Sequence, residues 1–591
     1  MPLDDPVNEG PPLPEEARIA FRDLAKAAGI NFLHINSPSE KHYVPEIMGG
    51  GAAWIDYDQD GYMDLLLVQG GRFPVPAEEK RTGPTTRLYH NNGDGTFTDV
   101  TEKSGIRHPS FGQGVAVGDY DNDGFPDLLI TCYGHCHLFH NEPDGKGSRH
   151  FREVTREAGV VTDGWCTSCT FADLHGNGFL DIFMCRYVIM DLKNFPKCAH
   201  KHVNGKEVLI ACGPKEFKGN QCVLYKNNGN GTFTNVSDKC CVDGKGNRTG
   251  LEPEGKGLGV LILDFDDDGI MDIFVGNDEI QNHFYRGRRN GEFESVGYSH
   301  GCAASEAGGP MGSMGVEAGD LFGKGNADIF VTTFFNEGNT LYRNEGKAFF
   351  TDVSKQGGLY HACFNNVGWG TCLLDVRRNG MLDIFVGNGH VYSNAEELDM
   401  RMPNGEKHHY KQNAQLFLGD GRGHFREISS QAGPYFLERH VGRGVAMGDY
   451  DNDGHMDIAI NNCGEAAALL HNETETPNHW IRLVLEGNRP VNPQGSNRDA
   501  IGAKVTLTMA GKKLVRHLKG GGSYLSAHDR RLLVGLGAAT QVDEVEVRWP
   551  NRAASTQRFG PLAADHSYRL VEGAGAAVAA HCPPIKPKRS N

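Results

Sequence analysis

The 591-residue sequence lacks several features that would place it in a familiar class of protein. No apolar run is long enough to span a bilayer, because carboxylates interrupt the best candidate, VLILDFDDDGIMDIFV at residues 260–275. The chain also lacks a Ser-His-Asp order, a phosphate-binding loop and an HExxH motif. The sequence therefore offers neither a transmembrane segment nor a standard catalytic signature.

The first residues do not form a signal peptide. Residues 1–20 are acidic and proline-rich, with neither a basic n-region nor an apolar h-region. We expect this segment to be flexible. Either the chain is cytosolic or a signal peptide has been removed, and we favour the second interpretation, a secreted, extracellular or periplasmic protein. The reasons are fifteen cysteines, many for a cytosolic chain, and the calcium sites argued below.

Positive charge is scarce over most of the chain. The net charge is −16 overall, but −25 over residues 1–478 and +6 over residues 479–572. Nucleic acid is therefore excluded as a partner of the large acidic part. The basic part could bind an anion, or it could dock on its acidic neighbour, which we expect. The sequence does not identify a protein, glycan or small-molecule ligand, and we expect a monomer.

Aspartate, by contrast, is concentrated in four short clusters. They read DYDQDGYMD at 56–64, DYDNDGFPD at 119–127, DFDDDGIMD at 264–272 and DYDNDGHMD at 449–457. Each follows one short apolar run and precedes another, with no helical pattern on either side. Bare carboxylates at such spacing would repel one another, so a cation is expected to neutralise them.

The clusters belong to a longer repeat. A phenylalanine-initiated motif such as FTDV or FREV occurs seven times, beginning at residues 21, 97, 151, 233, 293, 350 and 425. Between successive copies lie an aspartate turn and short apolar runs, which predicts four strands per unit and an all-β, seven-bladed β-propeller. The first copy has no strands before it, and the last unit lacks its fourth strand. We therefore predict that Phe21–Leu24 completes the seventh blade and closes the ring.

Oxygen ligands at positions 1, 3, 5, 7 and 9 around a turn glycine predict calcium sites. Magnesium demands a stricter octahedron, zinc prefers His or Cys, and an EF-hand would need Glu at position 12, where this chain has apolar residues. Position 7 contributes a backbone carbonyl. The predicted ligands are Asp56, Asp58, Asp60, Tyr62, Asp64, Asp119, Asp121, Asp123, Phe125, Asp127, Asp264, Asp266, Asp268, Ile270, Asp272, Asp449, Asp451, Asp453, His455 and Asp457.

Three further turns retain only the outer aspartates. They are DLHGNGFLD at 173–181, DLFGKGNAD at 320–328 and DVRRNGMLD at 375–383. We predict the same hairpin there, held by hydrogen bonds, with a weakly bound metal or none.

These motifs together resemble a known family. The aspartate loops, YVPEIMGGGAAWIDYDQDG, NNGDGTFTDV, GNGHVY and the C-terminal NRDAIGAKVTL, GGGSYLSAHDRRLLVGLG and VDEVEVRWPN are similar to the CRTAC (cartilage acidic protein)-like family over about residues 20–572. That family joins FG-GAP/VCBS repeats to an ASPIC/UnbV domain. The resemblance implies a secreted, calcium-bound, integrin-α-like seven-bladed propeller with a small β domain, and matrix or adhesion roles.

The cysteines leave alternatives open. The resemblance implies a disulfide between Cys198 and Cys212, and pairing that includes Cys222, Cys240 and Cys241 is also conceivable. The segment CYGHCHLFH at 132–140 and the pair Cys166 and Cys169 could form a soft-metal site, a disulfide or buried thiols. Alternation along strands sends neighbouring side chains to opposite faces, which disfavours the metal site.

A second candidate site lies at the mouth of the propeller channel. His34 and Glu46 precede the first inner strand, and His390 follows a later one. Glu46 as general base and His390 as acid would make a hydrolase or cyclase, whereas the alternative is that these residues cap the channel. We predict domains at 21–475 (propeller) and 478–572 (C-terminal β domain), a disordered tail at 573–591, and a secreted binding or scaffold function ahead of the enzyme.

Overall fold

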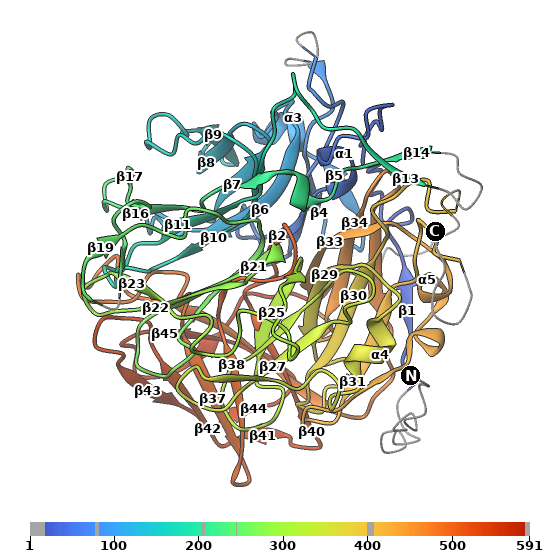
Figure 1. Ribbon diagram of the computed structural model, residues 1–591. Helices are drawn as coiled ribbons and strands as arrows, with labels where there is room; N and C mark the ends of the chain where they lie inside the picture. Colours follow the sequence, from blue (N-terminus) through green and yellow to red (C-terminus); the bar gives the residue numbers. More distant parts are fainter. Residues whose placement is uncertain are drawn as a thin grey trace.

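The computed structural model describes residues 18–76, 82–201, 207–243, 245–396, 398 and 407–585 (Figure 1). The protein is an all-β propeller with a C-terminal β domain packed against it. Residues 1–17, most of the predicted flexible N-terminal segment, lie outside the described part. Ile19 is already buried in the hydrophobic core.

Seven antiparallel sheets repeat one run of four strands, in which each strand pairs with the next along the chain, except where β1 completes the last sheet. Sheet one comprises β2 (Ala52–Ile55), β3 (Asp64–Leu67), β4 (Arg87–Asn91) and β5 (Phe97–Asp99). Sheet two comprises β6 (Gly112–Gly118), β7 (Asp127–Cys132), β8 (Cys136–Pro143) and β9 (Arg149–Glu153). Sheet three comprises β10 (Cys166–Ala172), β11 (Asp181–Arg186), β16 (Val223–Asn227) and β17 (Phe233–Asn235).

The remaining four sheets follow the same order. They comprise β20 (Gly257–Leu263), β21 (Asp272–Ile280), β22 (His283–Gly287) and β23 (Phe293–Ser295); β25 (Val316–Gly319), β26 (Asp328–Val331), β27 (Thr340–Asn344) and β28 (Phe350–Asp352); β29 (Gly368–Leu374), β30 (Asp383–Asn388), β31 (Gln415–Gly419) and β32 (Phe425–Glu427); and β33 (Gly442–Gly448), β34 (Asp457–Asn462), β35 (Ala468–Asn472) and β1 (Phe21–Asp23).

The first strands of these sheets contact one another in a closed cycle, from β2 through β6, β10, β20, β25 and β29 to β33 and back to β2. Most first and second strands are buried on both faces, because each sheet is covered by its two neighbours, and their sequences are accordingly continuous apolar runs such as Leu65–Leu66–Leu67. β1 pairs with β35 through Phe21 and Asn472, as predicted from the phase of the repeat. The N-terminal strand thus covers what would be an open edge.

Short helices and short strands lie in the connections between the longer strands. They are α1 (Pro45–Met48), α3 (Thr101–Ser104), α4 (Leu359–Cys363), α5 (Pro434–Leu437), η1 (Pro214–Glu216), η2 (Ser429–Gln431), β12 (Val188–Ile189), β13 (Cys198–Lys201), β14 (Glu207–Ile210), β15 (Lys218–Gly219), β18 (Cys241–Val242), β19 (Arg248–Thr249) and β24 (Met311–Gly312).

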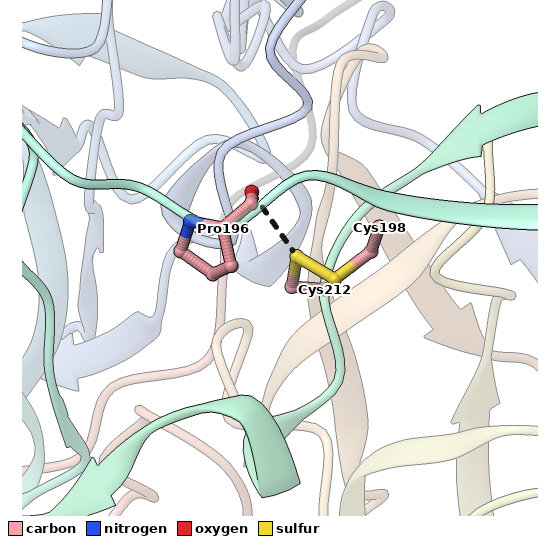
Figure 2. Close-up of a disulfide and its surroundings, with 3 residues drawn as sticks. All are labelled: Pro196, Cys198 and Cys212. Carbon is pink, nitrogen blue, oxygen red and sulfur yellow. Dashed lines mark hydrogen bonds between the residues drawn. A yellow bond between two sulfur atoms is a disulfide. The ribbon is translucent and has the colours of Figure 1, made fainter.

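The implied disulfide between Cys198 and Cys212 is present, within the insertion that carries β13 and β14 (Figure 2). The other thirteen cysteines are free, and all of them except Cys582 are buried. Pairing of Cys222, Cys240 or Cys241 with a further cysteine is therefore not observed.

The C-terminal domain contains two four-stranded sheets around its own core. Their order is β40-β36-β45-β46 and β38-β37-β42-β43, with bounds β36 (His479–Glu486), β37 (Lys504–Met509), β38 (Lys512–His517), β40 (Leu532–Gly537), β42 (Glu544–Arg548), β43 (Thr556–Phe559), β45 (His566–Val571) and β46 (Val578–Ala579); β39 (Gly520–Gly521), β41 (Gln541–Val542) and β44 (Leu562–Ala563) are shorter. Ile481, Val505, Val545 and Trp549 lie in this core.

One segment of the C-terminal domain enters the centre of the propeller. This channel segment, residues 519–529, pairs with β20 through β39 and forms hydrogen bonds with the innermost strand of every other sheet. For example, the Ala52 amide donates to Ser526 Oγ (3.1 Å) and the Val115 amide to the Leu525 carbonyl (3.0 Å). The channel segment therefore fills the axis with a backbone whose hydrogen-bonding groups are satisfied by the surrounding strands.

The tail departs from its prediction. Residues 573–591 were predicted to be disordered, but β46 pairs with β45 and the Ile585 amide donates to the Asp451 carbonyl (3.0 Å). Ile585 packs on the apolar cluster around Trp54, which gives the tail a hydrophobic anchor that its glycine- and proline-rich composition conceals. Residues 586–591 lie outside the described part.

Candidate metal centres at the aspartate loops

The first and ninth residues of each aspartate loop hold the bend itself. In the second loop, Asp119 Oδ2 accepts the Gly124 amide (2.8 Å), and Asp127 Oδ2 accepts the Tyr120 amide (3.2 Å). Asp127 Oδ1 also accepts the Asn141 amide (2.8 Å) from the third strand. The ninth aspartate therefore fixes the bend to the sheet, and it is fully buried.

Aspartates of three complete loops converge with a histidine that was not predicted as a ligand of these loops. Three sets of side chains each bring one oxygen or nitrogen per residue within 4.8 Å of one another: Asp58, Asp64 and His90; Asp121, Asp123 and His140; Asp451, Asp457 and His471. Each histidine lies near the end of the third strand of its sheet. The signal in the sequence was the tripeptide YHN, FHN or LHN at that place, and of the three histidines only His140 was considered as a metal ligand, in the segment CYGHCHLFH.

Burial and mutual repulsion make the ionised form of these carboxyl groups costly. Together they raise the pKa of Asp56 and Asp119 to about 8 and that of Asp451 to about 9. Burial raises the pKa of Asp64 and Asp127 to about 7. A cation at the loop would remove this cost.

The first loop also contains oxygen atoms without a partner. Asp56 Oδ1 and Asp58 Oδ1 are buried and make no hydrogen bond. Asp56, Asp58 and Asp60 form a further set of three converging carboxylates. Orphaned buried oxygens beside like charges are what a calcium ion would satisfy, so the residues present fit the predicted ion.

The position 7 residue follows the aspartates within the same bend, and its carbonyl stays a predicted ligand. The amides of Tyr62, Phe125, Ile270 and His455 donate to the position 5 aspartates over 2.7–2.9 Å. The His455 side chain is half-buried, and this partial burial lowers its pKa to about 3, so its ring is neutral.

The loop at 264–272 has an arginine where the other complete loops have the histidine. Arg286 Nε donates to Asp266 Oδ2 (2.6 Å), and Lys504 of the C-terminal domain pairs with Asp267 (2.7 Å). Burial raises the pKa of Asp264 only to about 6, because Arg548 opposes the rise. Fixed positive charge thus supplies part of the neutralisation at this loop.

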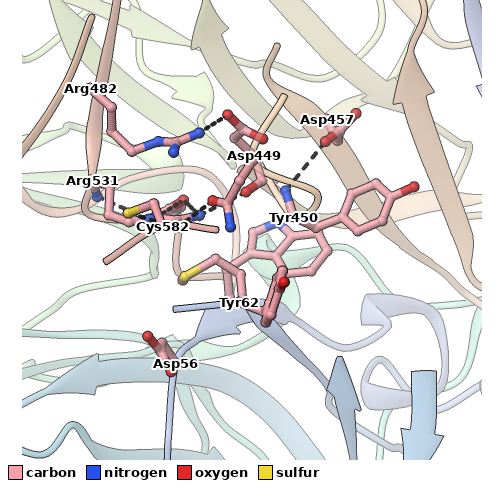
Figure 3. A network of polar contacts seen from close by, with 12 residues as sticks. Asp56, Tyr62, Asp449, Tyr450, Asp457, Arg482, Arg531 and Cys582 are labelled. Atoms are coloured by element: carbon pink, nitrogen blue, oxygen red, sulfur yellow. Dashed lines mark hydrogen bonds and ion pairs between the residues drawn. The ribbon is translucent and has the colours of Figure 1, made fainter. Parts of the chain in front are cut away.

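Arginines of the C-terminal domain reach the first aspartate of three loops. Arg482 pairs with Asp449, Arg548 with Asp264, and Arg498 lies 3.8 Å from Asp119. Figure 3 shows Arg482 on Asp449, with Arg531 donating to the Asp449 carbonyl (2.7 Å). The basic C-terminal domain therefore docks on its acidic neighbour, as expected from the uneven charge.

The three residues proposed for the channel mouth are placed around a buried arginine. Arg443 donates to the carbonyl of Ile47, which follows Glu46, and to the carbonyl of the candidate His390. Burial lowers the pKa of His34 and of His390 to about 3, so both rings are neutral, and it raises the pKa of Glu46. Glu46 accepts the Ser39 amide (3.0 Å), and among the described residues no hydrogen bond or ion pair joins Glu46 to His34 or His390. The enzyme alternative stays a prediction.

A cavity between the C-terminal domain and the propeller lies elsewhere. It has a volume of about 120 Å³ and is lined by residues of the C-terminal domain, including His517 and Arg530, and by inner strands of the propeller. Glu46, His34 and His390 do not line it.

Comparison with known proteins supports the same two-part architecture. Residues 56–130, 119–184 and 264–331 match the FG-GAP-like repeat, and residues 493–577 match the ASPIC and UnbV domain. Cartilage acidic protein 1 of Homo sapiens is 25% identical over 202 residues, and that of Mus musculus is 24% identical over 202 residues. The chain is a homologue of cartilage acidic protein 1. Each match covers 34% of this chain, but only 25% of the human protein and 26% of the mouse protein.

Solved structures resemble this chain only weakly in sequence and in backbone geometry. A lectin of Agrocybe aegerita that recognises non-reducing terminal N-acetylglucosamine is 14% identical, with a TM-score of 0.35 over 72% of this chain and 90% of the lectin. Among the described residues, no helix has the length and apolar character needed to cross a membrane.

Proposed function

We propose that the protein is a calcium-binding β-propeller that acts outside the cytosol as a binding or scaffold protein. The observation that carries the proposal is the convergence of buried, partly unpartnered carboxylates at the aspartate loops. Bound calcium would supply the positive charge that lets these carboxylates ionise while the sheets stay packed.

The proposed location rests on chemistry that is uncommon in the cytosol. A disulfide joins Cys198 and Cys212, and the chain is similar to cartilage acidic protein 1. The binding role that we propose is adhesion-like.

The scaffold proposal is tested by metal content and by stability together. Protein purified in calcium and passed through a desalting column should retain about four calcium ions per chain by mass spectrometry of the metal. Thermal unfolding should move to lower temperature on chelation and recover on adding calcium but not magnesium. Retention of no calcium, with an unchanged melting temperature, would disprove the proposal.

The enzyme alternative has its own test. Glu46→Gln and His390→Ala should leave ligand binding intact and should remove no turnover from a panel of ester and sugar substrates. Loss of a measured turnover in both variants, at an unchanged melting temperature, would instead favour the channel-mouth enzyme.

A further inference from the structure

A second group of metal-ligating side chains differs in ligand type from the aspartate loops. It consists of His108, Cys132 and His137, each of which offers one nitrogen or sulfur within 4.8 Å of the others. Cys132 is the last residue of β7, and His137 lies on β8 of the same sheet. His108 comes from the connection between sheets one and two, where its amide donates to Thr85 Oγ1 (3.0 Å).

Strand register explains why these residues meet while their neighbours do not. His137 pairs with Ile130, so its side chain shares a face with Ile130 and Cys132, toward sheet one. Cys136 belongs to the opposite apolar cluster, and His140 joins the second aspartate loop. Only part of the CYGHCHLFH motif therefore enters the group, and its third member lies 24 residues before Cys132.

His108 is the observation that points to a ligand. Its side chain is 4% exposed, yet both ring nitrogens are buried and make no hydrogen bond. Its ring centroid lies 4.5 Å from that of His137. A core histidine normally has at least one ring nitrogen satisfied, so this ring lacks the partner that its burial requires.

The surroundings of His137 match those of a metal-bound imidazole. His137 Nδ1 lies 3.0 Å from Glu153 Oε1, which leaves Nε2, in contact with Ser110 Oγ, as the nitrogen available to an ion. A carboxylate on the outer ring nitrogen orients a ligating histidine and raises its basicity. Ser110 Oγ lies 3.0 Å from His137 Nε2 and 2.9 Å from His135 Nε2, at the exposed side. An ion thus has a way in from solvent, and a water molecule or His135 can complete its coordination.

We infer that His108, Cys132 and His137 bind a zinc ion that links the connection after sheet one to sheet two. One thiolate and two imidazoles suit zinc and exclude calcium and magnesium, which take oxygen ligands. On binding, the Cys132 thiol releases its proton to solvent and a zinc–sulfur bond forms, with no oxidation or reduction. The site is independent of calcium in the aspartate loops.

The test uses full-length, calcium-saturated protein, because calcium then occupies the carboxylate sites that could also take zinc. Cobalt(II) should bind with a stoichiometry of one and give a thiolate-to-cobalt charge-transfer band that zinc abolishes. X-ray absorption of the zinc form should show one sulfur at about 2.3 Å and nitrogens at about 2.0–2.1 Å. A first shell without sulfur would overturn the inference, even if every variant failed to fold.

Variants then assign the ligands. Cys132→Ser should abolish the charge-transfer band, and His108→Ala should weaken zinc binding by more than the roughly 10–100-fold expected for Glu153→Gln. Cys363→Ser removes another buried free thiol and should change neither, and His90→Ala should leave zinc content unaltered. Full zinc binding in Cys132→Ser, or copper binding without zinc or cobalt binding, would overturn the assignment.

Discussion

The four complete aspartate loops and the three degraded ones share one bend but differ in how its charge is balanced. In all seven, the position 6 glycine amide donates to the first aspartate over 2.6–3.1 Å. The amide at position 2 donates to the last aspartate over 2.9–3.4 Å, again in all seven. The hairpin itself is thus held by hydrogen bonds, as predicted for the degraded loops.

Position 3 is where the two groups diverge. It is Asp58, Asp121, Asp266 or Asp451 in the complete loops, and His175, Phe322 or Arg377 in the degraded ones. His175 Nδ1 lies 2.7 Å from Asp181 Oδ2, and Arg377 Nη2 donates to Asp383 Oδ1 (2.8 Å). Two degraded loops therefore carry an internal group that pairs with the ninth aspartate. In three complete loops a histidine of the third strand pairs with the ninth aspartate over 3.0–3.1 Å. The outer acids thus hold the turn in both groups, and the acid at position 3 is what sets the complete loops apart.

The largest expected effect is that of removing all calcium. At free calcium 100-fold above the dissociation constant, each site stabilises the native state by about 2.7 kcal/mol, or on the order of 10 kcal/mol for four sites. Differential scanning calorimetry with and without a chelator measures this loss. Re-addition of calcium is the control for irreversible unfolding. A melting temperature that the chelator does not change would contradict the proposed difference between the two groups of loops.

The degraded loops should respond to loss of their internal partner instead. Arg377→Leu leaves Asp383 buried without its ion pair, which typically costs about 3–5 kcal/mol. This loss should be the same in calcium and in chelator. Arg422→Leu, an exposed arginine near the same sheet, is the matched control and should change stability by less than about 0.5 kcal/mol. Rescue of Arg377→Leu by calcium would show that this loop can bind the ion after all.

A change in a single complete loop should remove only the stability that the calcium ion of that loop contributes. Asp121→Asn keeps the acceptor for the Asp123 amide but removes a charge, so we expect about 2–3 kcal/mol less stability in calcium and no loss in chelator. Asp375→Ala, in a degraded loop, removes the acceptor for the Asn379 and Gly380 amides and should cost about 1–3 kcal/mol under both conditions. Equal losses for Asp121→Asn in both conditions would place that acid with the turn rather than with the metal.

The sequence predicted the features that depend on local pattern. Repeat phase located β1 on the last sheet, and acid spacing identified the bends, because both follow from residues a few positions apart. The histidines His90, His140 and His471 were within reach of the same reasoning, since each recurs at one place in the repeat.

The missed features depend on contacts between distant segments. The Ala52 amide and Ser526 meet across 474 residues, and Arg482 and Asp449 meet between two domains. No periodicity reports such contacts, so neither the channel segment nor the arginines on the first aspartates could be assigned. The tail was misjudged for the same reason, because Ile585 becomes an anchor only when the cluster around Trp54 exists to receive it.

The last expected effect is a pH dependence confined to the chelated protein. The pKa of Asp56 and of Asp119 is about 8 in the folded state without metal, against about 3.9 in an unfolded chain. The folded state then holds protons that the unfolded state has released, so stability is fully present below about pH 3.9 and is lost as pH rises through about 8. The slope is at most about 1.4 kcal/mol per pH unit for each such carboxyl.

Calcium should remove this slope, because it binds the ionised carboxylates and becomes more effective as they deprotonate. Chemical unfolding at pH 5, 6, 7 and 8, with calcium and with chelator, measures both curves. The Asp121→Asn variant should show a shallower slope in chelator than the native sequence, since one neighbouring charge is gone from Asp119. A chelated protein that gained stability from pH 5 to 8 would mean that other groups already neutralise the carboxylates of the complete loops, as at the loop 264–272. A metal would then not be needed there.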